Sequence, residues 1–180
     1  MIFKRWFKPK WQHQDAAVRV KAIAELNRDS SDHKEILHEL AFNDGAETVR
    51  KTALEQLNEF SLWWQASKHE SAERLKQFAE QQLIGMLLDN RVSAQLKQQF
   101  INECNRSSIL EKLAQTETDA SLKFALIQRL ARQDLYLSGV LDPNFSAEQR
   151  MALLEFLNDD KTLEKLSRQL DGALLAGQFF

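Results

Sequence analysis

The residues best suited to catalysis or metal binding are four histidines and a single cysteine. His33 and His38 are five positions apart and would not share one helical face, and the sequence has no H-E-x-x-H or C-x-x-C motif. A metal site needs several converging ligands, and a cysteine nucleophile needs a base and an activating environment. Cys104 instead occupies an apolar position of a helical pattern, which is typical of core packing. The sequence therefore predicts no catalytic residue, no metal site, no cofactor and no enzyme activity.

The N-terminal arm, residues 1–14, combines basic and aromatic side chains and contains no acidic residue. Three roles suit this composition. The arm could anchor at an anionic membrane surface, contact nucleic-acid phosphates and stack on bases, or cap the first helix pair with its aromatics. We favour the cap, with basic residues that still contact a partner. The candidate partner-binding residues in this arm are Lys4, Arg5, Trp6, Lys8, Lys10 and Trp11.

Two adjacent tryptophans, Trp63 and Trp64, are the other candidates for partner binding. Neighbouring residues on a helix point about 100° apart, so both indoles do not fit one narrow buried stripe. Two interpretations stay open. Either one ring lies in the core and the other on a partner surface, where Trp is enriched, or both pack beneath an inserted helix.

Arg19 and Arg50 recur at equivalent places, with acidic residues on either side of each. They could form a basic edge that grips an acidic ligand. They could also pair with acids of their own or the adjacent repeat. We favour structural pairing, because the pattern belongs to the repeat itself.

Composition and charge limit the function classes. The 180 residues carry a formal net charge of −2 with a pI of about 6.1, whereas a protein that mainly grips nucleic acid shows a basic excess or stripe. The lone cysteine excludes an internal disulfide and fits a reducing compartment. No apolar run is long enough to span a bilayer, and the N-terminus lacks the pattern of a secretory signal. We expect a cytoplasmic protein without a transmembrane segment.

Helical repeats are the elements that position these residues. The sequence has only 2 Pro and 5 Gly and lacks the period of strands. One pattern recurs along the chain, and we call its first residue the anchor. A basic residue follows the anchor directly, and apolar residues lie four, five and eight positions after it, on one helical face. Anchors lie at 18, 49, 96, 122 and 149, and the longest gap leaves room for an extra helix. Turns that contain Asp, Asn or Gly precede most anchors, and Ser146 with Gln149 predicts a capping box.

The segments at 15–26 and 47–57, each reading V-R-x-x-A-[IL] after an acidic turn, resemble the second helix of a HEAT-type repeat. The opening M-I-F-K-R-W-F-K-P-K-W, followed directly by such repeats, resembles the N-terminal part of long bacterial proteins of the "domain of unknown function 349" family. The charged, coiled-coil-like helices that define that family are missing here, so this resemblance implies an N-terminal fragment of a longer protein. Neither resemblance implies a biochemical activity.

These observations predict an all-α fold, a HEAT-like α-α superhelix (solenoid) of about five helix pairs, with residues 15–180 as one domain. The leading function hypothesis is a non-catalytic scaffold that presents a helical surface to an unidentified protein partner. The alternative is a nucleic-acid- or ribosome-associated protein that binds through residues 1–11. A HEAT-like DNA glycosylase or lyase is a remote third. Clustered Lys and Arg in a groove would favour the glycosylase, and an acidic or apolar groove would favour a protein partner.

Overall fold

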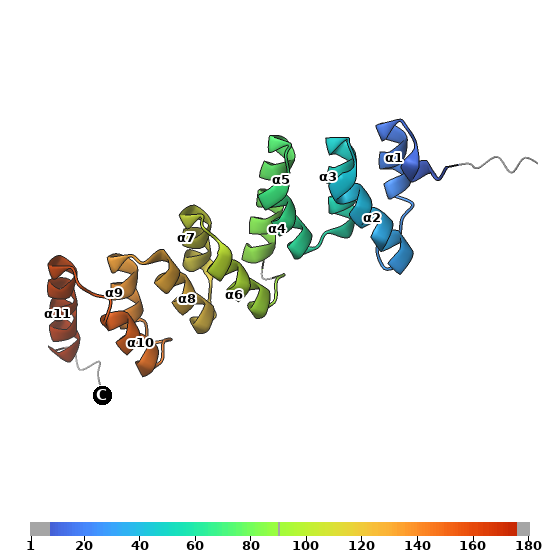
Figure 1. The fold of residues 1–180 in the computed structure, drawn as a ribbon. Coiled ribbons are helices and arrows are strands. Elements are labelled where there is room, and N and C mark those ends of the chain that lie inside the picture. Colours follow the sequence, from blue (N-terminus) through green and yellow to red (C-terminus); the bar gives the residue numbers. More distant parts are fainter. Residues whose placement is uncertain (1–7, 90, 176–180) are drawn as a thin grey trace, which may run out of the picture. The chain divides into compact units, whose positions relative to one another are not determined.

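The computed structural model describes the backbone of residues 8–89 and 91–175, with side chains up to Gln169. Within that part, helices joined by short turns run from end to end, and there is no strand. This confirms the all-α prediction (Figure 1). The helices are η1 (a 3-10 helix, Lys10–Gln12), α1 (Ala16–Ile23), α2 (Ser31–Asn43), α3 (Glu47–Leu57), α4 (Phe60–His69), α5 (Glu73–Leu88), α6 (Ala94–Glu103), α7 (Ser107–Thr116), α8 (Ala120–Leu130), α9 (Gln133–Leu141), α10 (Ala147–Leu154) and α11 (Asp160–Leu175).

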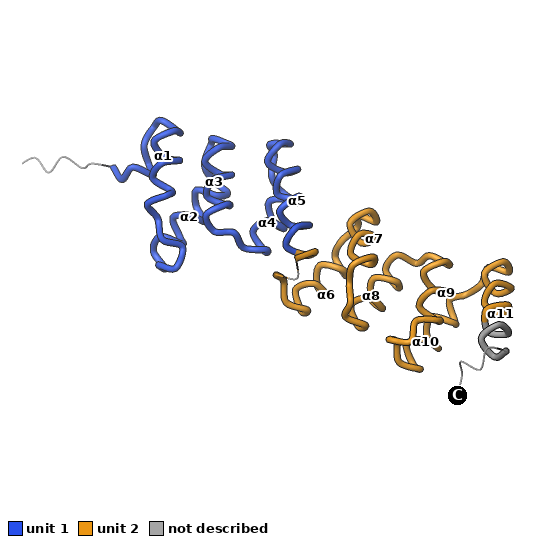
Figure 2. The backbone as a smooth tube through the Cα atoms, turned by 180° about the vertical axis from the view of Figure 1, so that it is seen from behind, with its two compact units in different colours: residues 1–86 blue, residues 87–180 orange. Residues whose placement is uncertain are grey.

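The chain divides into two compact units, residues 1–86 and residues 87–180 (Figure 2). In unit 1, α2 packs against α3, and α3 packs against α1, which also contacts η1. In unit 2, α8 contacts α6, α7 and α9, and α9 contacts α10 and α11. Each unit thus contains antiparallel helix pairs that bury their apolar faces against neighbouring helices.

All five predicted anchors lie at the third position of a helix: Val18 in α1, Val49 in α3, Leu96 in α6, Leu122 in α8 and Gln149 in α10. Sequence reading missed a sixth, Leu75, at the third position of α5. Lys76 follows it and Ala79 is fully buried, but Glu80 stands where the pattern expects Ile or Leu. The long gap between anchors 49 and 96 therefore holds α4 and α5, which confirms the extra helix.

Local capping explains where several of these helices begin. Asp15, Ser93 and Asp119 each accept a hydrogen bond from a backbone amide in the first turn of the helix that follows. The predicted capping box is confirmed, because the Ser146 hydroxyl accepts from the Gln149 amide and the Gln149 side chain accepts from the Ser146 amide.

The core of unit 2 includes Gly139, where α9 approaches its neighbours closely. A Cβ at this position would collide with the Leu153 side chain and would lie 3.1 Å from Phe145. Leu153 is fully buried in the same cluster. A glycine in the last turn of α9, despite its weak helix propensity, therefore serves close packing.

Candidate interaction surface

Acidic residues at the C-terminal ends of α2 and α4 bind the basic residues of other helices in unit 1. Arg19 Nε and Nη2 donate to the two carboxylate oxygens of Asp44, both at 2.7 Å. Arg50 donates in the same way to Glu70, at 2.9 and 2.7 Å. The third guanidinium nitrogen donates to backbone carbonyls, those of His13 and Gln14 for Arg19 and that of Asp44 for Arg50. Every guanidinium nitrogen of both arginines therefore donates a hydrogen bond within unit 1.

Unit 2 repeats the arrangement with lysines. Lys97 Nζ lies 2.7 Å from a carboxylate oxygen of Glu117, at the end of α7, and both side chains are about 93% buried. Lys123 Nζ lies 2.8 Å from a carboxylate oxygen of Asp142, at the end of α9. We call these four contacts the turn ion pairs. They confirm the structural interpretation of Arg19 and Arg50 and remove these arginines as a site for an acidic ligand.

The turn ion pairs keep their carboxylates ionised. Burial raises the pKa of Asp44, but hydrogen bonds from Arg19 and the Ala46 amide outweigh it, and the pKa falls below its ordinary value. The hydrogen bond from Arg50 is the largest influence on the pKa of Glu70 and lowers it against the opposing effect of burial. The same carboxylates also accept backbone amides of the turn, so each acid links its own turn to a distant helix.

The two acids of unit 2 behave alike. Burial raises the pKa of Glu117, and the hydrogen bonds from Lys97 and from backbone amides of the turn more than reverse this and lower it. The Lys123 ammonium, followed by the Asn144 amide, lowers the pKa of Asp142. All four carboxylates are therefore charged at neutral pH and stabilise the turns that separate paired helices.

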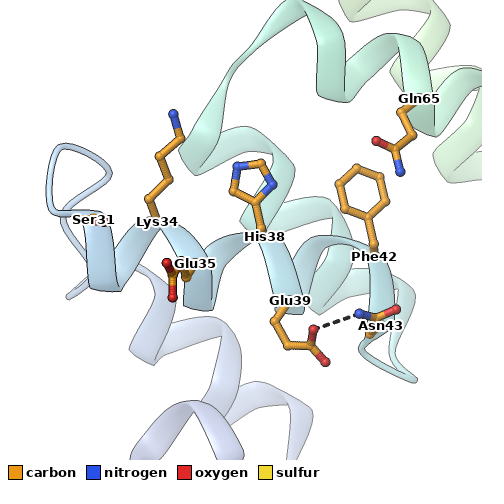
Figure 3. Close-up of a pocket in the computed structure, with 8 residues that line it drawn as sticks. All are labelled: Ser31, Lys34, Glu35, His38, Glu39, Phe42, Asn43 and Gln65. Atoms are coloured by element: carbon orange, nitrogen blue, oxygen red, sulfur yellow. Dashed lines mark hydrogen bonds between the residues drawn. The ribbon is translucent and has the colours of Figure 1, made fainter.

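The outer surface of α2 carries two parallel rows of side chains with a spacing of four residues. Lys34, His38 and Phe42 form one row, and Glu35 and Glu39 form the other (Figure 3). The two rows project in different directions from the helix, as the close-up shows. α2 therefore presents a basic and aromatic row beside an acidic one.

Three hollows follow these rows within unit 1, and we call them together the α2 groove. The His38 hollow, of about 590 Å³, is lined by Ser31, Lys34, Glu35, His38, Glu39, Phe42, Asn43 and Gln65. The Trp11 hollow, of about 330 Å³, is lined by Trp11, Gln12, Asp32, Glu35, Ile36, Glu39 and Leu40. The Glu70 hollow, also about 330 Å³, is lined by Phe42, Asp44, Arg50, Gln65, Ala66, His69, Glu70 and Ser71. Neighbouring hollows share lining residues. Glu35 and Glu39 line both the His38 and Trp11 hollows, and Phe42 and Gln65 line both the His38 and Glu70 hollows.

The uncompensated charge of the α2 groove is acidic. Lys34 is held by Glu59 at 2.7 Å, and Arg50 is held by Glu70. Asp32 and Glu35 have no hydrogen-bond or ion-pair partner among the described residues. Among the described residues, Glu39 accepts one hydrogen bond, from the side-chain amide of Asn43 at 2.8 Å. A ligand in this groove therefore meets negative charge beside aromatic and aliphatic surface.

Of the predicted partner-binding residues in the arm, the structure places one in the α2 groove. Lys4, Arg5 and Trp6 lie outside the described residues. Lys8 is exposed and Lys10 forms an exposed ion pair with Glu25 at 3.0 Å. Trp11, half-buried in η1, lines a hollow against α2.

The tryptophan pair on α4 is divided between core and surface. Trp63 is 1% exposed, packs edge-on against Phe78 of α5 and donates to Asn58 Oδ1 at 3.4 Å. Trp64 is half-buried beside the Phe60 ring, and the Lys68 ammonium lies 4.1 Å from its ring centre. Trp63 is therefore a core residue, and Trp64 keeps an accessible edge away from the α2 groove.

Sequence reading missed the side chains of α2 that line the groove. It treated His38 only as a possible metal ligand and did not single out Phe42, Glu35 or Glu39. The available signal was the spacing 34, 38, 42 beside 35, 39, which places two rows of different character on one helix. The spacing alone does not reveal that η1 and α4 flank this helix and turn the rows into a groove.

Among the residues that the structure describes, no three His, Cys, Asp or Glu side chains are grouped so that they could hold a metal ion. No helix in this described part of the chain is both long and apolar enough to cross a membrane.

Comparisons of the chain with protein-family models, with curated proteins and with solved structures found no match.

Proposed function

We propose that the protein is a non-catalytic interaction module, built of HEAT-like helical repeats, that binds a partner protein through the α2 groove. The observation that carries the proposal is the character of the groove, in which carboxylates without a cation lie beside Trp11, Ile36 and Phe42. Aromatic and aliphatic side chains beside polar groups are typical of protein-binding surfaces.

Charge favours a protein partner over nucleic acid. A phosphate backbone in the α2 groove would be repelled by Asp32, Glu35 and Glu39, and the Lys and Arg that line the groove, Lys34 and Arg50, are paired with carboxylates. The basic residues of the turn ion pairs are held by carboxylates, and Lys10 is held by Glu25. The same argument disfavours a DNA glycosylase, which would need a basic groove.

The experiment is a tagged pull-down from the native lysate with and without nuclease. The test variant carries Glu35→Arg and Glu39→Arg. The control carries Glu55→Arg and Glu73→Arg, which reverse the same charge in unit 1 at exposed positions that do not line the groove. A third variant lacks residues 1–7 and keeps Trp11. Far-UV circular dichroism and thermal melts verify that each variant folds.

We expect a protein that the wild type, the control and the truncated chain all capture, that resists nuclease and that the groove variant loses. Capture that disappears with nuclease, or with residues 1–7, while the groove variant still binds would overturn the proposal in favour of a nucleic-acid role for the arm. Equal losses from the groove variant and its charge-matched control would also contradict it, because they would indicate non-specific electrostatics.

A further inference from the structure

The Trp11 hollow has a more specific chemistry than the rest of the α2 groove. Its volume of about 330 Å³ is ample for a single long side chain. Trp11 comes from η1, and Ile36 and Leu40 come from the flank of α2. These three side chains provide a mostly apolar lining.

Three acidic residues also line this hollow, Asp32, Glu35 and Glu39. The first two have no partner within the described residues, and the third has only an amide from Asn43. Lys34, on the same helix, and Lys10, next to Trp11 in the chain, form ion pairs with other carboxylates, those of Glu59 and Glu25. No cation among the described residues therefore balances the negative charge of the hollow.

The occupant that fits must combine a cation with an apolar stem. An anionic group would be repelled, and a neutral apolar side chain would remove water from carboxylates without replacing their hydrogen bonds. A bare metal ion is disfavoured, because these carboxylates are not grouped closely enough to hold one. Lys and Arg side chains pack their stems on apolar surface and keep the charged head on polar groups, and Trp is the best aromatic partner of a cation.

We propose that the Trp11 hollow receives an arginine or lysine side chain from a basic segment of the partner protein. The stem packs on Ile36 and Leu40, the cation lies against the Trp11 indole, and Asp32 and Glu35 accept its N–H donors. This inference rests on the proposed function and assigns the chemistry of the partner at one end of the α2 groove.

The test uses a fluorescein-labelled peptide of repeated Arg-Ser-Gly and the same peptide with citrulline in place of arginine. Citrulline keeps the length and shape of arginine and removes the charge. Binding to the full chain is followed by fluorescence anisotropy and by the Trp11 indole N–H resonance, which Trp11→Phe identifies. The test variant is Asp32→Asn with Glu35→Gln, and the control is Asp29→Asn with Glu55→Gln, which removes two exposed charges from unit 1 outside the hollow.

We expect the arginine peptide to shift the Trp11 indole resonance and to bind at least about tenfold more tightly than the citrulline peptide. The test variant should lose about tenfold in affinity, and the control should keep it. Equal binding of the two peptides, or equal losses from both variants, would overturn the inference. If that happens while the groove variant still loses the captured protein in the pull-down, the proposed function stands and only the basic-side-chain assignment fails.

Discussion

Unit 1 and unit 2 build the same turn ion pairs from different cations. Unit 1 uses arginine, whose planar fork contacts both oxygens of an acid and a backbone carbonyl of the turn as well. Unit 2 uses lysine, whose single ammonium contacts one carboxylate oxygen in each pair. All four turns therefore receive a cation, and the choice of cation sets how many hydrogen bonds it donates there.

The largest expected effect comes from acid, which acts on all four turn ion pairs together. Each carboxylate has a lower pKa in the folded state than its ordinary value of 3.8 for Asp or 4.5 for Glu. The stability that they contribute is complete above those ordinary values and is lost as the pH falls through the lower folded pKa values. Urea unfolding at a series of pH values should show a free energy of unfolding that falls steadily below about pH 4.5.

A flat pH profile down to about pH 3 would contradict this expectation and would mean that the pairs contribute little net stability. The double variant Lys97→Met with Glu117→Gln is the matched control. It lacks one pair, so its profile in acid should be shallower than that of the wild type.

Removing one buried cation should give the next largest effect. Lys97→Met leaves the Glu117 carboxylate buried without its partner, which should lower the free energy of unfolding by about 3–5 kcal/mol. The double variant with Glu117→Gln should recover much of this loss, because no buried charge remains. A loss below about 1 kcal/mol would show that water solvates Glu117 in the variant.

The same variant tests whether the two units are coupled. All four tryptophans fall within residues 1–86 and the single tyrosine, Tyr136, within 87–180. Tryptophan fluorescence therefore reports on unit 1, and circular dichroism reports on both. If residues 15–180 form one domain, as the sequence predicts, the unfolding transitions followed by fluorescence and by circular dichroism should shift together in Lys97→Met. A shift in circular dichroism with unchanged tryptophan fluorescence would contradict it.

A smaller effect should distinguish arginine from lysine at the equivalent position. Arg50→Lys keeps the charge, but one ammonium replaces the contacts to both Glu70 oxygens and to the Asp44 carbonyl. We expect a loss of about 1.5–3 kcal/mol in chemical denaturation followed by tryptophan fluorescence. The reverse change, Lys123→Arg at a partly exposed pair, should stay within about 0.5 kcal/mol. If both changes are neutral, charge alone matters at this position.

The smallest predicted effect concerns matching helix ends in the two units. Asn58 follows α3 and Ala131 follows α8, and both adopt the left-handed backbone conformation, with φ of 48° and 52°. Asparagine tolerates this conformation and alanine is strained in it. Ala131→Asn should stabilise unit 2 by about 0.5–1 kcal/mol in thermal melts. Asn58→Ala should destabilise unit 1 by at least as much, because it also removes the acceptor of the Trp63 indole N–H. Shifts of the same sign would refute this assignment of strain.

Much of the candidate surface could not be predicted from the sequence. The arm suggested Trp11, and the structure places Trp11 in the α2 groove. The adjacent pair Trp63 and Trp64 suggested a surface, and the structure buries Trp63 against Phe78. The decisive residues, Glu35 and Glu39, look like any solvated helix face until η1 and α4 are seen on either side of them.

The sequence by itself determined the helices, the turns and the register of the repeat. Apolar periodicity and capping are local properties, which is why the predicted anchors and the Ser146 capping box agree with the structure. Only the tertiary structure decided which acid holds which base, such as Arg19 with Asp44, because helix stacking brings together residues 25 positions apart. The α2 groove has the same origin, since a row of side chains becomes a binding surface only where neighbouring helices flank it.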